Sequence, residues 1–197
     1  MSHAQQPQLT VLDARAWRSW LRRNHTASTG VWLVLAKKGT VEPTSLSYDQ
    51  ALDEALCHGW IDGQVRRRDA DTYLQRFTPR RPRSRWSKRN VGIVERLAAS
   101  GRMRPAGIAQ VEQAQADGRW EGAYTGQAQA AVPADLRAAL DADPAANATF
   151  EKLTSQNRYA VIFRIEGLRR PESRARRIEE YVAMLARGET LHPQRAR

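Results

Sequence analysis

The chain has 197 residues and a single cysteine, Cys57, which excludes an internal disulfide framework and a cysteine-rich zinc site. This length suits one domain of ordinary size or two small ones. The N-terminal residues lack a basic, apolar signal region and the strongest apolar run covers only 31–36, so we expect a cytoplasmic protein without a membrane span.

Positive charge is concentrated in one segment of the chain. The net charge is +11, and residues 64–90 carry ten basic side chains against two acidic ones. Such a focused field attracts phosphate, nucleic acid, acidic lipid or a carboxylate. Arginine outnumbers lysine 28 to 4, which indicates either bidentate recognition of an anion or a solvated surface on which arginine serves only as a cation.

Hydrophobic periodicity and turn residues predict an α+β domain with a small sheet in the first part of the chain. The expected elements are a helix over 11–23, a strand over 31–37, a helix over 48–57, strands over 60–63 and 73–78, and helices over 88–99 and 105–118. A polar turn over 66–71 joins the two later strands into a hairpin, and a proline-interrupted loop follows over 80–85.

Local signals place the beginnings of the first two helices. Thr10 and Asp13 have the spacing of an N-cap and the third helical residue, and Leu12 then falls on the apolar face. Ser47 and Gln50 have the spacing of a capping box for the second helix.

The rest of the chain is predicted to be helical. Helices are expected over 133–141, 145–154, 156–168 and 172–187. A stretch rich in Gly, Ala and Gln over 122–132 is typical of a linker, so we expect an α+β domain over 1–121 and a helical domain over 133–197. The predicted fold class is therefore α+β, with a small sheet and helices followed by a C-terminal helical domain.

An ordered series of motifs occupies residues 57–90. It consists of Cys57-His58-Gly59-Trp60-Ile61-Asp62-Gly63, Tyr73, Arg76-Phe77-Thr78-Pro79-Arg80, Ser84, Trp86-Ser87 and Asn90. This series resembles the bacterial YdeI/OmpD-associated family, also labelled bacteriocin-protection proteins, and the tail over 133–188 looks like the C-terminal domain of that family. The resemblance implies a role in surviving antimicrobial peptides or envelope stress, and it implies no reaction and no catalytic residue.

The same segment supplies the candidate ligand-binding residues. They combine flat aromatic rings, arginines and small hydroxyl groups, and they are His58, Trp60, Asp62, Arg76, Thr78, Arg80, Ser84, Trp86, Ser87, Lys88 and Asn90. A phosphorylated or nucleobase-like ligand uses that set of groups. Ser87 is also placed to cap the helix that begins at Lys88. The alternative is that the tryptophans anchor the core and the serines only cap helices.

Catalytic and metal motifs are weak or absent in the sequence. Cys57 beside His58 suggests a nucleophile and a base, but neighbours in a helix do not face each other. His58 and Asp62 are a second possible acid–base pair. The sequence contains no HExxH, CxxC, GxGxxG or P-loop motif, so we expect no metal and no cofactor. The helix pair over 88–118 fits an αα-hairpin better than a helix-turn-helix, because the second helix carries no basic residue.

Three functions are consistent with these patterns. The first is a non-enzymatic stress or antimicrobial-resistance protein that binds an anionic, phosphate-containing ligand through the basic and aromatic residues of 58–90. The second is a nucleic-acid-binding module that uses the same segment. The third is an enzyme acting on a small phosphorylated substrate, with His58, Asp62 and Ser87 as candidates. The oligomeric state does not follow from the sequence.

Overall fold

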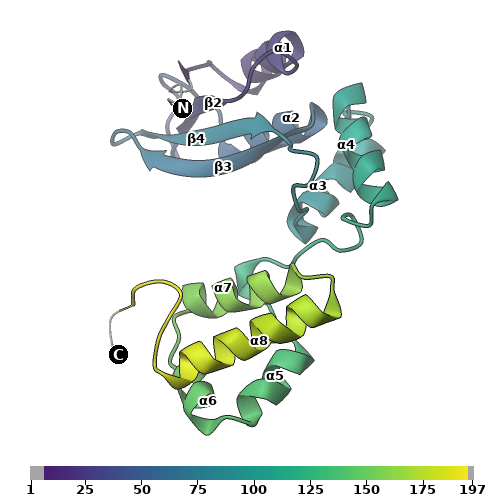
Figure 1. The fold of residues 1–197 in the computed structure, drawn as a ribbon. Coiled ribbons are helices and arrows are strands. Elements are labelled where there is room, and N and C mark those ends of the chain that lie inside the picture. The colour runs from purple at the N-terminus through teal and green to yellow at the C-terminus, as the bar shows by residue number, and fades with distance from the viewer. Residues whose placement is uncertain (1–6, 195–197) are drawn as a thin grey trace. The chain divides into compact units, whose positions relative to one another are not determined.

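A four-stranded sheet is the centre of the first part of the chain in the computed structural model, which describes residues 7–194 (Figure 1). The strands are β1 (Gln8–Leu9), β2 (Val31–Ala36), β3 (Trp60–Arg67) and β4 (Thr72–Pro79). They lie in the order β1-β2-β4-β3, where β1 is parallel to β2 and the other pairs are antiparallel. The predicted strands and hairpin are confirmed, although both hairpin strands are longer than expected and the two-residue β1 was not predicted.

Helices that precede and follow the hairpin in the sequence complete this first part of the chain. They are α1 (Ala14–Asn24), α2 (Tyr48–Cys57), α3 (Lys88–Ala99) and α4 (Pro105–Ala116). The capping box of α2 is confirmed, because Ser47 and Gln50 exchange side-chain and backbone hydrogen bonds. Gly101 follows α3 with a φ of +67°, a conformation that glycine adopts without steric cost.

The predicted start of the first helix was wrong. Asp13, rather than Thr10, caps α1, because its carboxylate accepts the Ala16 N–H at 2.8 Å. The helix begins at Ala14, so Leu12 lies before it and is 65 % exposed instead of facing the core. A carboxylate three residues before a free helical N–H is a strong cap. Asp13 therefore serves as the N-cap that the sequence pattern assigned to Thr10.

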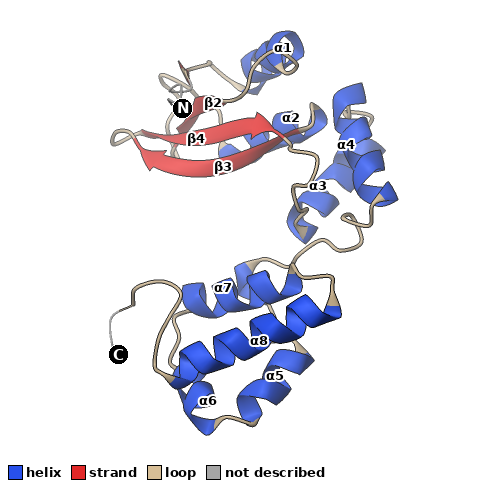
Figure 2. Ribbon diagram, viewed as in Figure 1, coloured by secondary structure: helices blue, strands red, loops and turns tan. Residues whose placement is uncertain are grey.

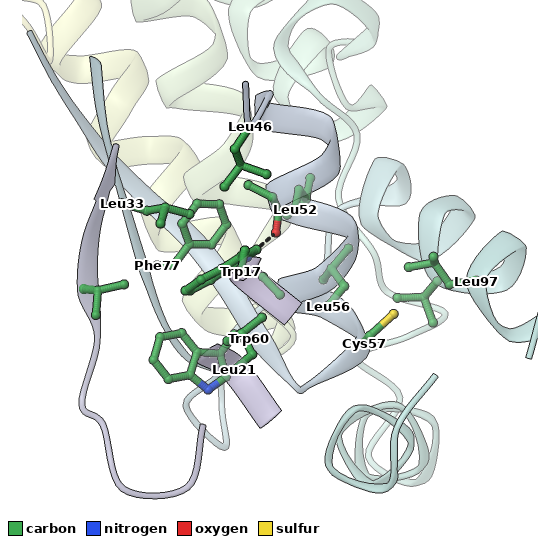
Figure 3. Close-up of a cluster of buried hydrophobic side chains, with 14 of the residues drawn as sticks. Trp17, Leu21, Leu33, Leu46, Leu52, Leu56, Cys57, Trp60, Phe77 and Leu97 are labelled. Carbon is green, nitrogen blue, oxygen red and sulfur yellow. Dashed lines mark hydrogen bonds between the residues drawn. The ribbon is translucent and has the colours of Figure 1, made fainter. Parts of the chain in front are cut away.

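Side chains from α1, α2 and the sheet form one continuous hydrophobic core (Figure 3). Trp17 lies at its centre, where its ring packs against Trp60 and Phe77. Its indole N–H donates a hydrogen bond to the Ala51 carbonyl at 3.1 Å, which Figure 3 marks with a dashed line. The buried indole therefore joins α1 to α2 without leaving its own polar atom unsatisfied.

The second part of the chain is helical in the residues that the structure describes (Figure 2). It contains a short 3₁₀ turn (Gln127–Gln129) and the helices α5 (Ala134–Asp141), α6 (Pro144–Glu151), α7 (Ser155–Glu166) and α8 (Pro171–Ala186). Its own core includes Leu140, Phe150, Ile162 and Leu185. The predicted helical C-terminal region is confirmed, and with it the α+β fold class.

The described residues divide into two units that meet in sequence between Ala123 and Tyr124. Each unit buries a separate hydrophobic cluster, and Trp120 still packs against the first one. Between residues 7 and 194 the structure contains no helix with the length and apolar character needed to span a bilayer.

Candidate functional site

The side chains of the candidate residues make separate sets of contacts rather than one cluster. Arg80 lies flat on Trp86, with its guanidinium carbon 3.5 Å from the ring centroid, and donates hydrogen bonds to Ser84 Oγ and the Arg85 carbonyl. Trp86 is 2 % exposed and also meets the ring of Trp120 edge-on. One face of this indole is thus covered by an arginine, and the pair fixes the loop between β4 and α3.

Trp60 is also part of the core. It is 1 % exposed, and its indole N–H donates to the His25 carbonyl at 3.1 Å. Neither Trp60 nor Trp86 offers an open ring to a ligand, because both rings are buried. Ser87 caps α3 as expected, because its hydroxyl accepts the Asn90 N–H at 3.2 Å.

Asp62 pairs with a tyrosine instead of His58. The Tyr48 hydroxyl donates to Asp62 Oδ2 at 2.9 Å, and Arg89 donates to the same hydroxyl at 3.3 Å. Burial, followed by the charge of Asp62, raises the pKa of Tyr48 to about 12. The structure therefore does not bring His58 and Asp62 together as an acid–base pair.

Three further ligand-binding candidates and the candidate nucleophile Cys57 have ordinary structural surroundings. Arg76 and Thr78 lie on β4, where Arg76 is opposite Trp32 of β2 and Thr78 is opposite Ile61 of β3. Lys88 is exposed at the first residue of α3. Cys57 is buried, and burial raises the pKa of its thiol to about 11, so the thiolate needed for nucleophilic attack is disfavoured at neutral pH.

A pocket of about 390 Å³ opens where α1, α2 and α4 end or begin, and His58 is the candidate residue that lines it. Its other lining residues are Arg22, His25, Arg104, Pro105 and Ala106. Arg22, His25 and Arg104 are not among the ligand-binding residues that the sequence predicts. They lie in two segments far from residues 58–90, and only the fold brings them to the same place.

The two histidines are held in the same way. His58 Nδ1 lies 2.9 Å from the Glu54 carbonyl, and His25 Nδ1 lies 2.9 Å from the Leu21 carbonyl. A carbonyl oxygen only accepts, so the Nδ1–H of each ring donates to that carbonyl. The rings meet edge to face with their centroids 5.5 Å apart. Each imidazole is thus held in one orientation by the helix whose C-terminal end it caps.

The surroundings of His58 favour its neutral form. It is 4 % exposed, and burial is the main cause that lowers its pKa, with smaller effects of the same sign from His25 and Arg104. Its hydrogen bond to the Glu54 carbonyl opposes this shift but does not cancel it. An anion beside the ring would favour the protonated form and reverse the shift.

Two glycines allow α4 to approach the end of α2. A Cβ on Gly107 would lie 2.4 Å from the Cys57 carbonyl oxygen, and a Cβ on Gly59 would lie 2.8 Å from the Ala106 carbonyl oxygen. Gly59 also has a φ of +74°, which favours glycine. The contact is completed by the Arg104 N–H, which donates to the Cys57 carbonyl at 3.1 Å. The first turn of α4 therefore lies directly beside His58.

That turn adds positive electrostatic potential to the pocket. Pro105 is the first helical residue of α4, and no side chain caps the helix at Arg104. The N–H groups of a first helical turn have no partner within the helix and carry the positive end of its dipole. Arg22 and Arg104 are exposed and form no ion pair with any residue from 7 to 194. The pocket thus combines two guanidinium groups, two imidazoles and a helix N-terminus.

A buried carboxylate fixes the backbone that leads into α4. Glu54 accepts two hydrogen bonds from Arg18, at 2.8 and 2.7 Å, and one from Arg102 at 2.7 Å. Burial alone would raise its pKa, but the hydrogen bonds and charges of Arg18 and then Arg102 outweigh it, so the pKa of Glu54 is lowered. Arg102 also reaches Asp53, and it precedes Arg104 by two residues. The network therefore positions the start of α4.

The pocket has the chemistry of an oxyanion site rather than of a metal site. Guanidinium groups and helix N-terminal amides donate to phosphate, sulfate or carboxylate oxygens. Within residues 7–194, no three histidine, cysteine or acidic side chains gather as a metal ion would require.

The fold and pocket define an α+β domain with a basic cleft, followed by a helical domain. Residues 9–110, more than half of the chain, match the sequence model of a family described as a domain of unknown function (DUF8412), so the chain belongs to that family. Residues 129–188 match the family described as "Bacteriocin-protection, YdeI or OmpD-Associated", which confirms the expected family for the C-terminal region. The motif series over 57–90 lies within the first match. Searches of curated proteins and of solved structures found no match.

Proposed function

We propose that the protein binds a small ligand carrying a phosphate or similar oxyanion in the pocket between α1, α2 and α4. The observation that carries this proposal is the convergence of Arg22, Arg104 and the buried His58 on the first turn of α4. These residues replace most of the sequence-based cluster over 58–90, of which His58 alone lines the pocket.

The charges around the pocket support an anion over a neutral or cationic ligand. Arg22 and Arg104 have no acidic partner among residues 7–194, whereas the nearby arginines of the Glu54 network are already neutralised. An oxyanion would accept hydrogen bonds from the two guanidinium groups and would be attracted by the positive end of the α4 dipole. Charge-assisted hydrogen bonds of this kind each contribute roughly 1.5–3 kcal/mol.

Sulfate is the first probe, because it does not titrate near neutral pH. Isothermal titration calorimetry would compare the parent protein with the Arg22→Ala/Arg104→Ala variant. We expect the affinity for sulfate to fall by roughly tenfold or more, since two charge-assisted hydrogen bonds are lost. The matched control is Arg15→Ala/Arg23→Ala, which removes the same charge from exposed positions on α1. Equal losses in both variants would contradict the proposed site.

The pH dependence of sulfate binding provides a second readout. An anion beside the His58 ring stabilises its protonated form, so linkage requires the affinity to rise as the pH falls from the higher pKa of His58 in the complex towards its lowered pKa in the free protein. His58→Asn keeps a donor to the Glu54 carbonyl and removes the titrating group. The rise in affinity should be smaller in this variant, and an unchanged pH profile would exclude His58 from the site.

We extend this proposal to a role in resistance to antimicrobial peptides, because the C-terminal region belongs to a family described by bacteriocin protection. A protein with a net charge of +11 repels a cationic peptide, so protection would be indirect and would depend on the bound anion. Cells lacking the gene should regain peptide resistance with the parent protein but not with the Arg22→Ala/Arg104→Ala variant. Tight binding of polymyxin-like peptides by the purified protein would contradict this mechanism.

A further inference from the structure

The loop between β4 and α3, together with the first residue of α3, exposes positive charge. Arg81, Arg83 and Lys88 are exposed and form no ion pair with any residue between 7 and 194. Residues 80–90 contain six basic side chains and no acidic one. These three side chains, here called the basic loop, are distinct from the residues that line the oxyanion pocket.

Two further basic residues, Arg80 and Arg119, hold the loop in place. Arg80 stacks on the buried Trp86, and Arg119 Nη1 donates to the Ser84 carbonyl at 3.0 Å. A tight turn is closed by the Ser84 N–H, which donates to the Arg81 carbonyl at 2.9 Å. Because the backbone is already ordered, a partner would lose less conformational entropy on binding to this loop than to a flexible basic tail.

Several other arginines of the same unit are matched with carboxylates. Asp49, Asp53 and Glu54 on α2 form ion pairs with arginines of α1, of α3 and of the segment after α3. Asp117 is likewise occupied by Arg119, at 2.8 Å. The basic loop differs from these surfaces because its three cations lie within residues 81–88, a stretch without an acidic residue, and form no ion pair within residues 7–194. Its field therefore extends into solvent.

We propose that the basic loop binds the phosphate backbone of a nucleic acid without reading its base sequence. Arginine and lysine side chains contact phosphates, and such contacts position a protein without specifying a sequence. The rings of Trp60 and Trp86 are buried, so they offer no platform on which the bases of a single strand stack. The structure thus favours a duplex, whose charge density is higher, over a single strand.

The surroundings of the loop argue against an anionic membrane as the partner. Membrane-surface elements combine basic side chains with large apolar ones that enter the lipid. The large exposed apolar side chains of the described residues are Leu12, Val41, Val65 and Ile108, and none of them belongs to the loop. A nucleic acid needs no such insertion.

The test is fluorescence anisotropy of a short labelled DNA duplex, titrated with the full chain at several salt concentrations. Each phosphate contact contributes about −0.9 to the slope of log K against log salt, so Arg81→Ala/Arg83→Ala/Lys88→Ala should flatten the slope by roughly 3. The matched control, Arg15→Ala/Arg23→Ala/Lys38→Ala, removes three exposed cations that form no ion pair within residues 7–194, and it should retain the slope of the parent. Thermal melting of each variant confirms that it folds.

Several outcomes would overturn the inference. These are no duplex binding at low salt, an equal loss in the control variant, and a preference for the matching single strand. Binding to phosphatidylserine vesicles without binding to the duplex would assign the loop to a membrane instead. The Arg22→Ala/Arg104→Ala variant separates the two proposals, because it should lose sulfate binding and keep duplex binding.

Discussion

Glu54 is the side chain on which the contact between α1, α2 and the start of α4 depends. Replacing it by Gln keeps its shape but removes the charge that binds Arg18 and Arg102. We expect the free energy of unfolding to fall by about 2 kcal/mol, because hydrogen bonds to a charged group are lost at a side chain that is only 3 % exposed. Urea denaturation measures this change, with Asp49→Asn as the control.

Asp49 forms an exposed ion pair with Arg89, so its replacement should change the free energy of unfolding by less than about 1 kcal/mol. The pH dependence separates a charge effect from a packing effect. Because the pKa of Glu54 is lowered in the folded protein, its stabilisation is complete above about pH 4.5 and is lost as the pH falls through the lowered value. The Glu54→Gln variant should therefore lose less stability than the parent below pH 4.5. Parallel pH profiles would contradict an ionised Glu54 as the stabilising group.

The sequence predicts the local role of single residues better than their long-range contacts. Ser47 and Ser87 cap helices as expected, because a cap involves residues only three positions apart. Arg80 and Trp86 were predicted as ligand groups, yet they bury each other in the loop before α3. Their residue types fit either role. The choice depends on long-range packing, such as the ring of Trp120 against Trp86, which no local pattern encodes.

The same distinction holds for secondary-structure elements. Helices with a periodic apolar face and a local stop signal, such as α3 and α8, were predicted to within two residues. Strand β1 was missed because two residues carry no periodicity, and it exists only through its pairing with β2. The oxyanion pocket was missed for a related reason. His58 belongs to the recognised motif, but Arg22 and Arg104 reach it only when α1 and α4 pack beside α2.

The close contact between α4 and α2 predicts the effect of replacing Gly107. Gly107→Ala places a methyl group 2.4 Å from the Cys57 carbonyl oxygen, so α4 must move away from His58. We expect the free energy of unfolding to fall by about 1–3 kcal/mol, as in other overpacked sites, together with a loss of sulfate affinity. Urea denaturation and calorimetry measure the two effects.

Gly92 provides a matched control for this substitution. It lies within α3, and an added Cβ would meet no atom within 4 Å. Gly92→Ala should raise the free energy of unfolding by up to about 1 kcal/mol, because alanine favours the helix, and it should leave sulfate binding unchanged. If Gly107→Ala were equally harmless, the pocket could not depend on the close contact between α2 and α4.

At the scale of the whole molecule, the chain buries two hydrophobic cores instead of one. The cluster around Trp17 and Leu33 lies before Ala123, and the cluster around Phe150 lies after Tyr124. The oxyanion pocket and the basic loop both belong to the first unit. Separate cores imply that each unit opens with its own free energy, since cooperative unfolding follows contiguous packing.

Hydrogen exchange tests this independence in the full chain. Phe150→Ala should destabilise the second unit by about 3–5 kcal/mol, because it leaves a cavity among buried side chains. Amide protection should then fall across α5–α8 and stay unchanged in β2 and α2. Leu33→Ala should give the reverse pattern, since Leu33 is buried in the first core. Loss of protection in both units from either substitution would mean that the two cores unfold as one, and duplex or sulfate binding in the first unit would then depend on the integrity of the second.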